Sequence, residues 1–192
     1  MSVQLSDSLV LLRPPRSDDA DAMVAAARES AASVGRWLPW CHANYAKHES
    51  LAWIDAVRAA WEANEAFSFL IFDRGNGLLQ GGCAINEIDR LRLRANLGYW
   101  VRSSAQGRGV ATAAARLAAR FAIEKLAMQR IEIVAAVGNV ASQRVAVKLG
   151  ATYEGRWRNR LRIGETQTDA HGYSIIPSDV RAWTAPGDGE SQ

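Results

Sequence analysis

The pattern of hydrophobic and polar positions changes period several times along the chain, and each change predicts a new element. Runs with apolar residues three and four positions apart, such as Leu51, Ile54 and Val57, predict amphipathic helices. Shorter runs rich in β-branched and aromatic residues predict strands. The predicted helices cover residues 17–30, 48–64, 110–126 and 139–150. The predicted strands cover residues 8–14, 66–73, 78–89, 94–102 and 130–137, followed by a long hairpin over 151–176.

These elements follow the order β-α-α-β-β-β-α-β-α-β-β, which predicts a mixed α/β fold in which a sheet is flanked by helices. The chain has 192 residues, of which 48% are hydrophobic and 22% charged. This composition suits one packed domain and argues against disorder. We expect the domain to span residues 1–183 and residues 184–192, TAPGDGESQ, to form a flexible tail.

Composition and charge narrow the classes of protein further. Cys41 and Cys83 stand far apart and outside any metal-like spacing, so we expect reduced thiols, no bound metal and a cytoplasmic location. No apolar run approaches the roughly 18 residues that suggest a membrane span. Residues 1–15 lack the basic start and apolar stretch of a secretory signal. A net charge of +3 is too small to indicate nucleic-acid binding by itself.

Two glycines stand directly before the predicted helix over residues 110–126. The first amides of a helix lack internal partners and lie at the positive end of its dipole, so they can bind an anion such as a phosphate. Gly107 and Gly109 would leave this backbone open. A dinucleotide fingerprint is excluded because Thr112 stands where a third glycine is required, and a P-loop because no Gly-Lys-Ser/Thr triplet occurs. A tight turn before an ordinary helix is the alternative.

The segment QGRGVA, residues 106–111, resembles the acyl-CoA-binding motif of the GNAT superfamily of N-acetyltransferases, Gln/Arg-x-x-Gly-x-Gly/Ala. LGYWVRSSA precedes it, and NVASQRVAVKLGATYEG follows after one helix and one strand. This combination is similar to the branch that contains the ribosomal-protein N-terminal acetyltransferases. The resemblance extends from Leu9 to Asp179, nearly the whole chain.

The resemblance implies a mostly antiparallel, seven-stranded sheet that is splayed into a V and flanked by helices. It also implies acetyl-CoA as co-substrate, with the pantetheine arm on the strand edge inside the V and the diphosphate on the amides before the helix. The cofactor contacts it implies are Trp100, Val101, Arg102, Gln106, Gly107, Arg108, Gly109, Val110, Ala111, Thr112, Asn139 and Ser142. Asn139 is also a good helix N-cap and can serve both purposes.

Acetyl transfer needs a base for the amine and a hydrogen-bond donor for the oxyanion that forms on the thioester. The resemblance points to Glu87 as the base, and strand alternation would place it beside Ile85. A solvated carboxylate at the strand end is the alternative, and Asp89 and Glu154 are weaker candidates. For the oxyanion we expect the amide of Val101 or of its neighbour.

The leaving thiolate needs a proton or a hydrogen bond. Many relatives carry a tyrosine three residues after the asparagine, whereas this chain has Ser142, as the ribosomal-protein branch does. A serine hydroxyl is a poor acid, so we expect it to hydrogen-bond the sulfur or to act through water. Tyr153 and Tyr173 are alternative donors, and Cys83 is expected to be a buried thiol rather than a nucleophile.

Aromatic and arginine residues suggest where the acceptor binds. Trp37, Trp40 and Trp157 are expected to frame its groove, with core packing as the alternative. Arginines alternate over residues 156–162 and 90–94, which predicts a charged face on each strand. We take this alternation, with Arg158 as a contact, to favour an anionic acceptor, and a merely solvated face is the alternative.

The sequence therefore predicts an enzyme that moves acetyl from acetyl-CoA to a primary amine by direct attack in a ternary complex. A protein or peptide N-terminal amine is the leading acceptor, and a small-molecule amine such as an antibiotic is the alternative. A catalytically silent CoA-binding sensor and an RNA-associated protein stay open as other classes. The sequence leaves a longer acyl donor open, and also a homodimer, since relatives are often dimers.

Overall fold

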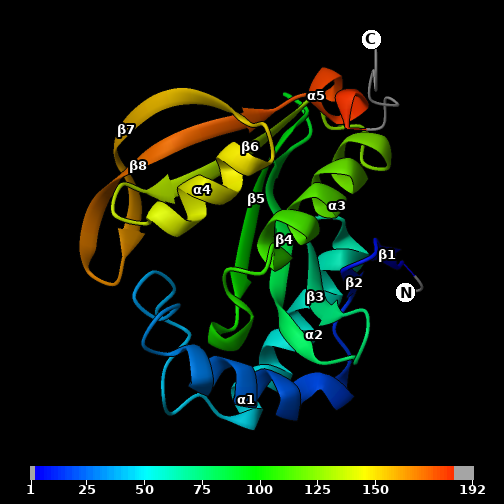
Figure 1. The fold of residues 1–192 in the computed structure, drawn as a ribbon, viewed down its shortest axis with the longest axis vertical. Coiled ribbons are helices and arrows are strands. Elements are labelled where there is room, and N and C mark those ends of the chain that lie inside the picture. Colours follow the sequence, from blue (N-terminus) through cyan, green and yellow to red (C-terminus); the bar gives the residue numbers. More distant parts are fainter. Residues whose placement is uncertain (1–2, 184–192) are drawn as a thin grey trace, which may run out of the picture.

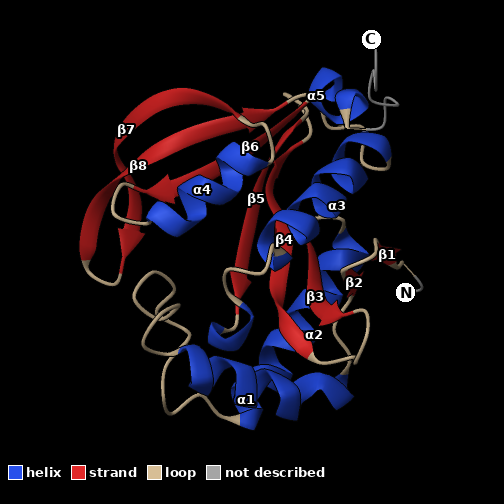
Figure 2. Cartoon of the chain, in the orientation of Figure 1, coloured by secondary structure: helices blue, strands red, loops and turns tan. Residues whose placement is uncertain are grey.

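Eight strands form one sheet in the computed structural model, which describes residues 3–183 (Figures 1 and 2). The strands are β1 (Leu5–Ser6), β2 (Val10–Arg13), β3 (Phe67–Asp73), β4 (Leu79–Asp89), β5 (Arg94–Val101), β6 (Arg130–Ala136), β7 (Thr152–Ile163) and β8 (Thr166–Ile175). The α-helices are α1 (Ala20–Ser30), α2 (Lys47–Ala63), α3 (Val110–Glu124), α4 (Val140–Lys148) and α5 (Pro177–Ala182). Two short 3₁₀ turns, η1 (Ser17–Asp19) and η2 (Ser103–Ala105), precede α1 and α3.

The mixed α/β class is confirmed, and every predicted element occurs in the predicted order; the structure adds β1 at the start and α5 at the end. The number of strands differs from the expected seven, because Leu5 and Ser6 pair with Leu12 and Leu11 and add a two-residue strand at one edge. The tail predicted at 184–192 lies outside the described residues. Within residues 3–183, no helix is both long and apolar enough to cross a membrane.

The sheet consists of two parts joined by a short parallel contact. Its strand order is β1-β2-β3-β4-β5-β6-β8-β7, and all neighbours are antiparallel except β5 and β6. Only residues 94–96 of β5 pair with residues 130–132 of β6, although β5 continues to Val101 and β6 to Ala136. Figure 1 shows the two strands meeting at one end and separating at the other. This separation is the V that the resemblance implied.

The helices cover opposite faces of the first part of the sheet (Figure 2). Along β3, Phe69 and Ile71 join the main core, to which α3 contributes a row of buried alanines. Leu70 and Phe72, which point the other way, pack with α1 and with Ile54 of α2. The alternation along β3 therefore explains why helices are needed on both faces. On the other face of the sheet, α3 packs against β4 and β5.

The β7–β8 hairpin does not present the single arginine face that the sequence predicted. The register between the strands shifts between Tyr153 and Gly155 and again between Trp157 and Leu161, and Asn159 adopts a φ of 49°. These irregularities break the two-residue alternation. Three of the arginines form ion pairs: Arg156 with Asp169, Arg160 with Glu87, and Arg162 with Glu165. On the β4–β5 side, Arg92 and Arg94 both pair with Asp89.

Candidate active site

A cavity of about 1090 Å³ lies where β5 and β6 separate, and residues from both faces of the sheet line it. The residues on the α3 side include Tyr99, Val101, Gly107, Gly109, Val110, Ala111, Thr112, Asn139 and Ser142. The residues on the α1–α2 side include Met23, Trp37, Trp40, Tyr45, Glu49, Trp53 and Trp100. Because one cavity reaches both faces, two ligands that enter from opposite sides can meet in the gap between the strands.

The glycines before α3 adopt the backbone conformation that leaves the helix start open. Gly107 and Gly109 have φ values of 77° and 82°, a region that side chains strongly disfavour. Gly109 occupies the N-cap position of α3, no side chain caps the helix, and its first turn contains no acidic residue. The amides of Val110, Ala111 and Thr112 therefore lack helical partners and line the cavity. Arg108 is exposed and lies outside the lining.

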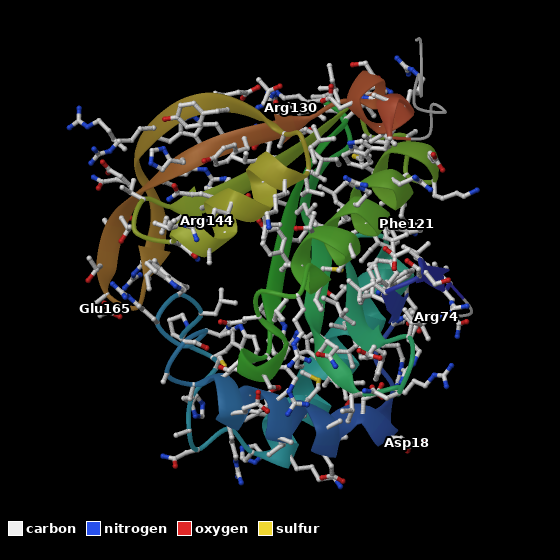
Figure 3. The ribbon with its side chains drawn as sticks, in the orientation of Figure 1. Asp18, Arg74, Phe121, Arg130, Arg144 and Glu165 are labelled. Atoms are coloured by element: carbon white, nitrogen blue, oxygen red, sulfur yellow. The ribbon has the colours of Figure 1, made fainter. Side chains whose placement is uncertain are left out.

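Two cations that the sequence analysis missed line the same side of the cavity. Arg144 and Lys148 stand four residues apart on α4, so they share one helix face. Figure 3 labels Arg144 on this helix. Their spacing within the predicted helix over residues 139–150 was the available signal. They add positive charge to the side that holds the start of α3.

Arg102 does not contact the cavity, contrary to the expectation. Its amide donates to the Gln80 carbonyl at 2.8 Å and its Nη1 to the Leu79 carbonyl at 3.1 Å. The rest of its guanidinium pairs with Glu29, whose carboxylate also accepts from the amide of Ser104. Arg102 thus ties the segment between β5 and α3 to α1 and so supports the glycines indirectly.

The edge of β5 that faces the gap pairs with no other strand beyond Asn96. Arg102 pairs with β4, so the alternation of an antiparallel ladder turns Val101 and Tyr99 toward β6. A hydrogen bond supports this direction: the Val101 carbonyl accepts from Nε2 of Gln106 at 3.2 Å. The same Nε2 donates to Ser33, so the Gln106 side chain braces the loop from within. The Val101 amide, the expected oxyanion donor, points into the gap.

A hydrogen-bond chain crosses the gap between β5 and α4. The Tyr99 hydroxyl donates to the Ser142 carbonyl at 3.0 Å and lies 3.2 Å from Oγ of Ser142. Asn139 caps α4, and its Oδ1 accepts from the Ser142 amide at 3.2 Å. Burial raises the pKa of Tyr99 to about 12, so its phenol stays protonated at neutral pH. Sequence reasoning missed Tyr99, although it stands next to the predicted contact Trp100.

Glu87 lies outside the residues that line the cavity. It adopts a φ of 49° in a bulge that disrupts the β4–β5 register, so the alternation expected from Ile85 does not reach it. Its side chain is 63% exposed and pairs with Arg160 at 3.3 Å. The apolar surroundings that strand alternation predicted for Glu87 are therefore missing.

The other expected candidates are held elsewhere. The amide and guanidinium of Arg92 lower the pKa of Asp89 to about 2, and Arg130 lowers that of Glu154 to about 2. Burial raises the pKa of the Cys83 thiol to about 12, which agrees with an inert thiol. Within residues 3–183, no three potential metal ligands of the histidine, cysteine or carboxylate type come together.

Two of the predicted acceptor residues line the cavity. Trp40 packs edge-on against Trp100 and Tyr45, with ring centroids 5.2 and 5.8 Å away. Trp37 covers Gly138 so closely that a Cβ atom there would lie 3.1 Å from its ring. The segment between α1 and α2 thereby reaches across the gap to the loop that follows β6.

The other two predicted acceptor residues, Trp157 and Arg158, do not line the cavity. The Trp157 indole covers the backbone of Gly172, where a Cβ atom would lie 2.4 Å from the ring. Trp157 is therefore a packing residue of the hairpin. Arg158 is exposed on the same strand.

Comparison with known proteins places the chain in a family. A sequence profile described as the acetyltransferase (GNAT) domain matches residues 10–152. The chain belongs to the GNAT family. It is thus an acetyltransferase of the GNAT type, as the sequence predicted.

Relatives of this GNAT protein share its length and fold. YdaF of Bacillus subtilis, provisionally named a ribosomal N-acetyltransferase, is 27% identical over 87% of this chain and 91% of its own. A Vibrio cholerae structure, provisionally described as a ribosomal-protein-serine acetyltransferase, is 30% identical with a TM-score of 0.80 and covers 92% of this chain and 98% of its own. Mycobacterium smegmatis RimJ, determined with a CoA-disulfide, is 24% identical with a TM-score of 0.83 over 92% and 87% of the two chains.

Replacing Glu29 by glutamine should make the stability of this GNAT protein less dependent on pH in acid. The Arg102 guanidinium, together with the Ser104 amide, lowers the pKa of Glu29 from its ordinary 4.5 to about 2. Since the folded-state pKa is the lower one, the carboxylate stabilises the fold above the unfolded-state pKa. That contribution is lost as the pH falls toward 2.

Urea unfolding between pH 6 and pH 3 measures this effect. Glu29→Gln should lower the free energy of unfolding at pH 6 by about 1 kcal/mol, allowing for partial exposure of the pair. Between pH 6 and pH 3, the free energy of unfolding of the variant should fall less steeply than that of the wild type. Glu62→Gln, at an exposed position of α2, is the matched control. A Glu29→Gln curve parallel to that of the wild type would contradict the role of the pair.

Proposed function

We propose that the protein transfers an acetyl group from acetyl-CoA to the N-terminal α-amine of a protein or peptide. The observation that carries this proposal is the single cavity that joins the open amides of α3 to the aromatic side through the gap between β5 and β6. RimJ, which shares the fold, binds a CoA-derived ligand, and relatives named for ribosomal-protein acetylation support the acceptor.

The cofactor would lie on the α3 side of the cavity. Its diphosphate accepts from the amides between Gly107 and Thr112, where the helix dipole and the absence of acidic side chains favour an anion. Arg144 and Lys148 supply cations on the same side. The amide-rich pantetheine arm pairs with the free edge of β5 in the manner of an added strand.

The reaction then proceeds by direct attack. The neutral amine attacks the thioester carbonyl carbon, and the oxyanion accepts a hydrogen bond from the Val101 amide. The intermediate collapses with cleavage of the C–S bond, and the thiolate accepts a hydrogen bond from the Ser142 hydroxyl. Tyr99 holds Ser142 in place through its bond to the Ser142 carbonyl. The proton of the amine leaves to solvent.

The absence of a poised base on the cavity wall favours an α-amine as acceptor. Glu49 is the one carboxylate among the described residues that line the cavity, and hydrogen bonds lower its pKa, the first from the Ala46 amide. An α-amine, with a pKa of about 8, is roughly one tenth neutral at pH 7, whereas a lysine amine is neutral in fewer than about one molecule in a thousand. An α-amine therefore needs little help to react. Glu87 remains a sequence-based prediction for the base.

An acceptor panel monitored by release of free CoA thiol tests the function. At pH 7, a peptide with a free N-terminus should give a kcat/KM at least about 100-fold above that of an Nα-blocked peptide containing lysine, given their fractions of neutral amine. Acetyl-CoA binding without thiol release from any amine would instead identify a sensor. Faster turnover of a small amine than of any peptide would move the acceptor to the small-molecule class.

Gly109→Val should raise the Kd for CoA by about 100-fold or more, measured by titration calorimetry. A branched side chain is strained at a φ of 82°, so the amides at the helix start would move. Gly150→Val is the matched control, because Gly150 has a φ of 75° and lies outside the cavity lining. Circular dichroism checks that both variants fold. Unaltered CoA affinity in the Gly109 variant would remove the diphosphate assignment.

Tyr99→Phe should lower kcat about tenfold and leave the KM for acetyl-CoA within about twofold, since Tyr99 acts on the leaving group through Ser142. Ser142→Ala should lower kcat at least as much. The kcat of the double variant should lie within about twofold of that of Ser142→Ala, because the two residues act as one unit. Independent, multiplicative losses in the double variant would separate the two residues and contradict this arrangement.

A further inference from the structure

The charged residues that line the cavity are divided between its two sides. Arg144 and Lys148 lie on α4, on the side proposed for the cofactor, and Figure 3 shows Arg144 there. Glu49 comes from α2, on the opposite side. Arg162, near the turn of the β7–β8 hairpin, also lines the cavity and donates to Glu165 at 2.6 Å. Glu49 is the one carboxylate among the described residues that line the cavity.

An unbroken row of aromatic contacts leads from the strand edge to Glu49, and we call it the aromatic wall. Its steps are Trp100 to Trp40 with ring centroids 5.2 Å apart, Trp40 to Tyr45 at 5.8 Å, Tyr45 to His42 at 5.9 Å, and His42 Nε2 to Glu49 Oε1 at 3.2 Å. Of this row, Trp100, Trp40, Tyr45 and Glu49 line the cavity, whereas His42 stands behind it. Trp53 follows Glu49 by one helical turn and lines the cavity as well. Indole and phenol faces attract cations and apolar groups alike.

Glu49 remains able to bind a ligand. Its Oε2 accepts from the Ala46 amide at 2.8 Å, and Oε1 contacts His42, which leaves further lone pairs on both oxygens. The side chain is 33% exposed, and Trp40 beside the same row is 37% exposed. The carboxylate keeps its negative charge at neutral pH, because hydrogen bonding holds its pKa below the usual range.

The group that Glu49 attracts differs from the amine that reacts. The reacting nitrogen has to be neutral and has to reach the gap beside the Val101 amide. Glu49 lies at the other end of the aromatic wall, with three rings between it and Trp100. A carboxylate that held the reacting nitrogen would also stabilise its protonated form and slow the attack.

On the basis of the proposed function, we propose that Glu49 binds a second positive charge of the acceptor, while the apolar part of that acceptor lies along the aromatic wall. The preferred acceptor is thus an amine separated by an apolar stretch from a further cation, either in a diamine or in a peptide with a basic side chain near its free N-terminus. This inference reverses the anionic acceptor expected from the arginines of the hairpin, three of which pair with carboxylates, while Arg158 lies outside the cavity lining.

A binding measurement tests the cation site without any turnover. Benzyltrimethylammonium, which cannot be acetylated, should bind at least about fivefold more tightly than benzyl alcohol or benzoate, as followed by calorimetry. Glu49→Gln should abolish that preference, because glutamine keeps the cap on α2 but removes the charge. Glu62→Gln on the same helix should preserve it. Equal binding of cation and benzoate to the wild type, or an unchanged preference in the Glu49 variant, would overturn the inference.

Steady-state kinetics then separates the two sources of the cation. One series compares linear diamines of three to eight carbons with monoamines of equal length. The other compares Ala-Phe-Lys amide with Ala-Phe-norleucine amide. In the wild type, the dicationic member of at least one series should show a KM about five- to tenfold lower than its monocationic partner. In Glu49→Gln, the KM values for the dicationic and the monocationic acceptor should lie within about twofold of each other, and the KM for acetyl-CoA should be unchanged.

The outcomes distinguish this inference from the proposed function. Cation binding that depends on Glu49, without thiol release from any amine, would leave the site in place and overturn acetyl transfer. Thiol release in which Glu49→Gln changes neither the KM ratio nor the cation preference would leave acetyl transfer in place and overturn the role of Glu49. A gain confined to the diamine series would place the acceptor among small molecules, and a gain confined to the peptides would place it among chain ends.

Discussion

The structure depends on the point at which β5 and β6 stop pairing. Beyond Asn96 and Glu132 both strands continue, but no backbone hydrogen bond joins them. Unpaired backbone groups inside a protein are costly, at about 1–3 kcal/mol each, so the gap has to be filled by water or by a ligand with matching groups. The contact between Tyr99 and Ser142 spans it from β5 to α4. α3 packs on β4 and β5, and α4 packs on β6, so each strand at the gap has its own helix to hold it in place.

The two sides of this gap differ in charge, and the difference suits a two-substrate reaction. The start of α3 and the cations of α4 concentrate positive potential on one side. The aromatic wall and Glu49 give the other side an apolar and negative character. If the protein acts as proposed, a polyanionic cofactor and a cationic acceptor are each drawn to their own side and meet beside the Val101 amide. Neither ligand needs to pass the site of the other.

Sequence patterns predicted whatever depends on neighbours along the chain. The periodicities gave the elements, and the two glycines gave the open start of α3. The patterns failed where the outcome depends on distant partners or on an irregular backbone. The bulge at Glu87 changes the direction of its side chain, and the local sequence NEID, residues 86–89, contains no signal that predicts a bulge. Tyr99 meets Ser142 across 43 positions, and Arg102 meets Glu29 across 73, so neither contact has a local signal.

The contact between Trp37 and Gly138 limits the shape of what can enter. The segment between α1 and α2 touches the loop after β6 through this contact, so the acceptor side of the cavity is closed at this point. An internal loop of a folded protein would have to bring two segments of chain past this contact at once, whereas a free chain end brings only one. If the protein acts as proposed, this contact favours a free chain end over an internal loop as the acceptor.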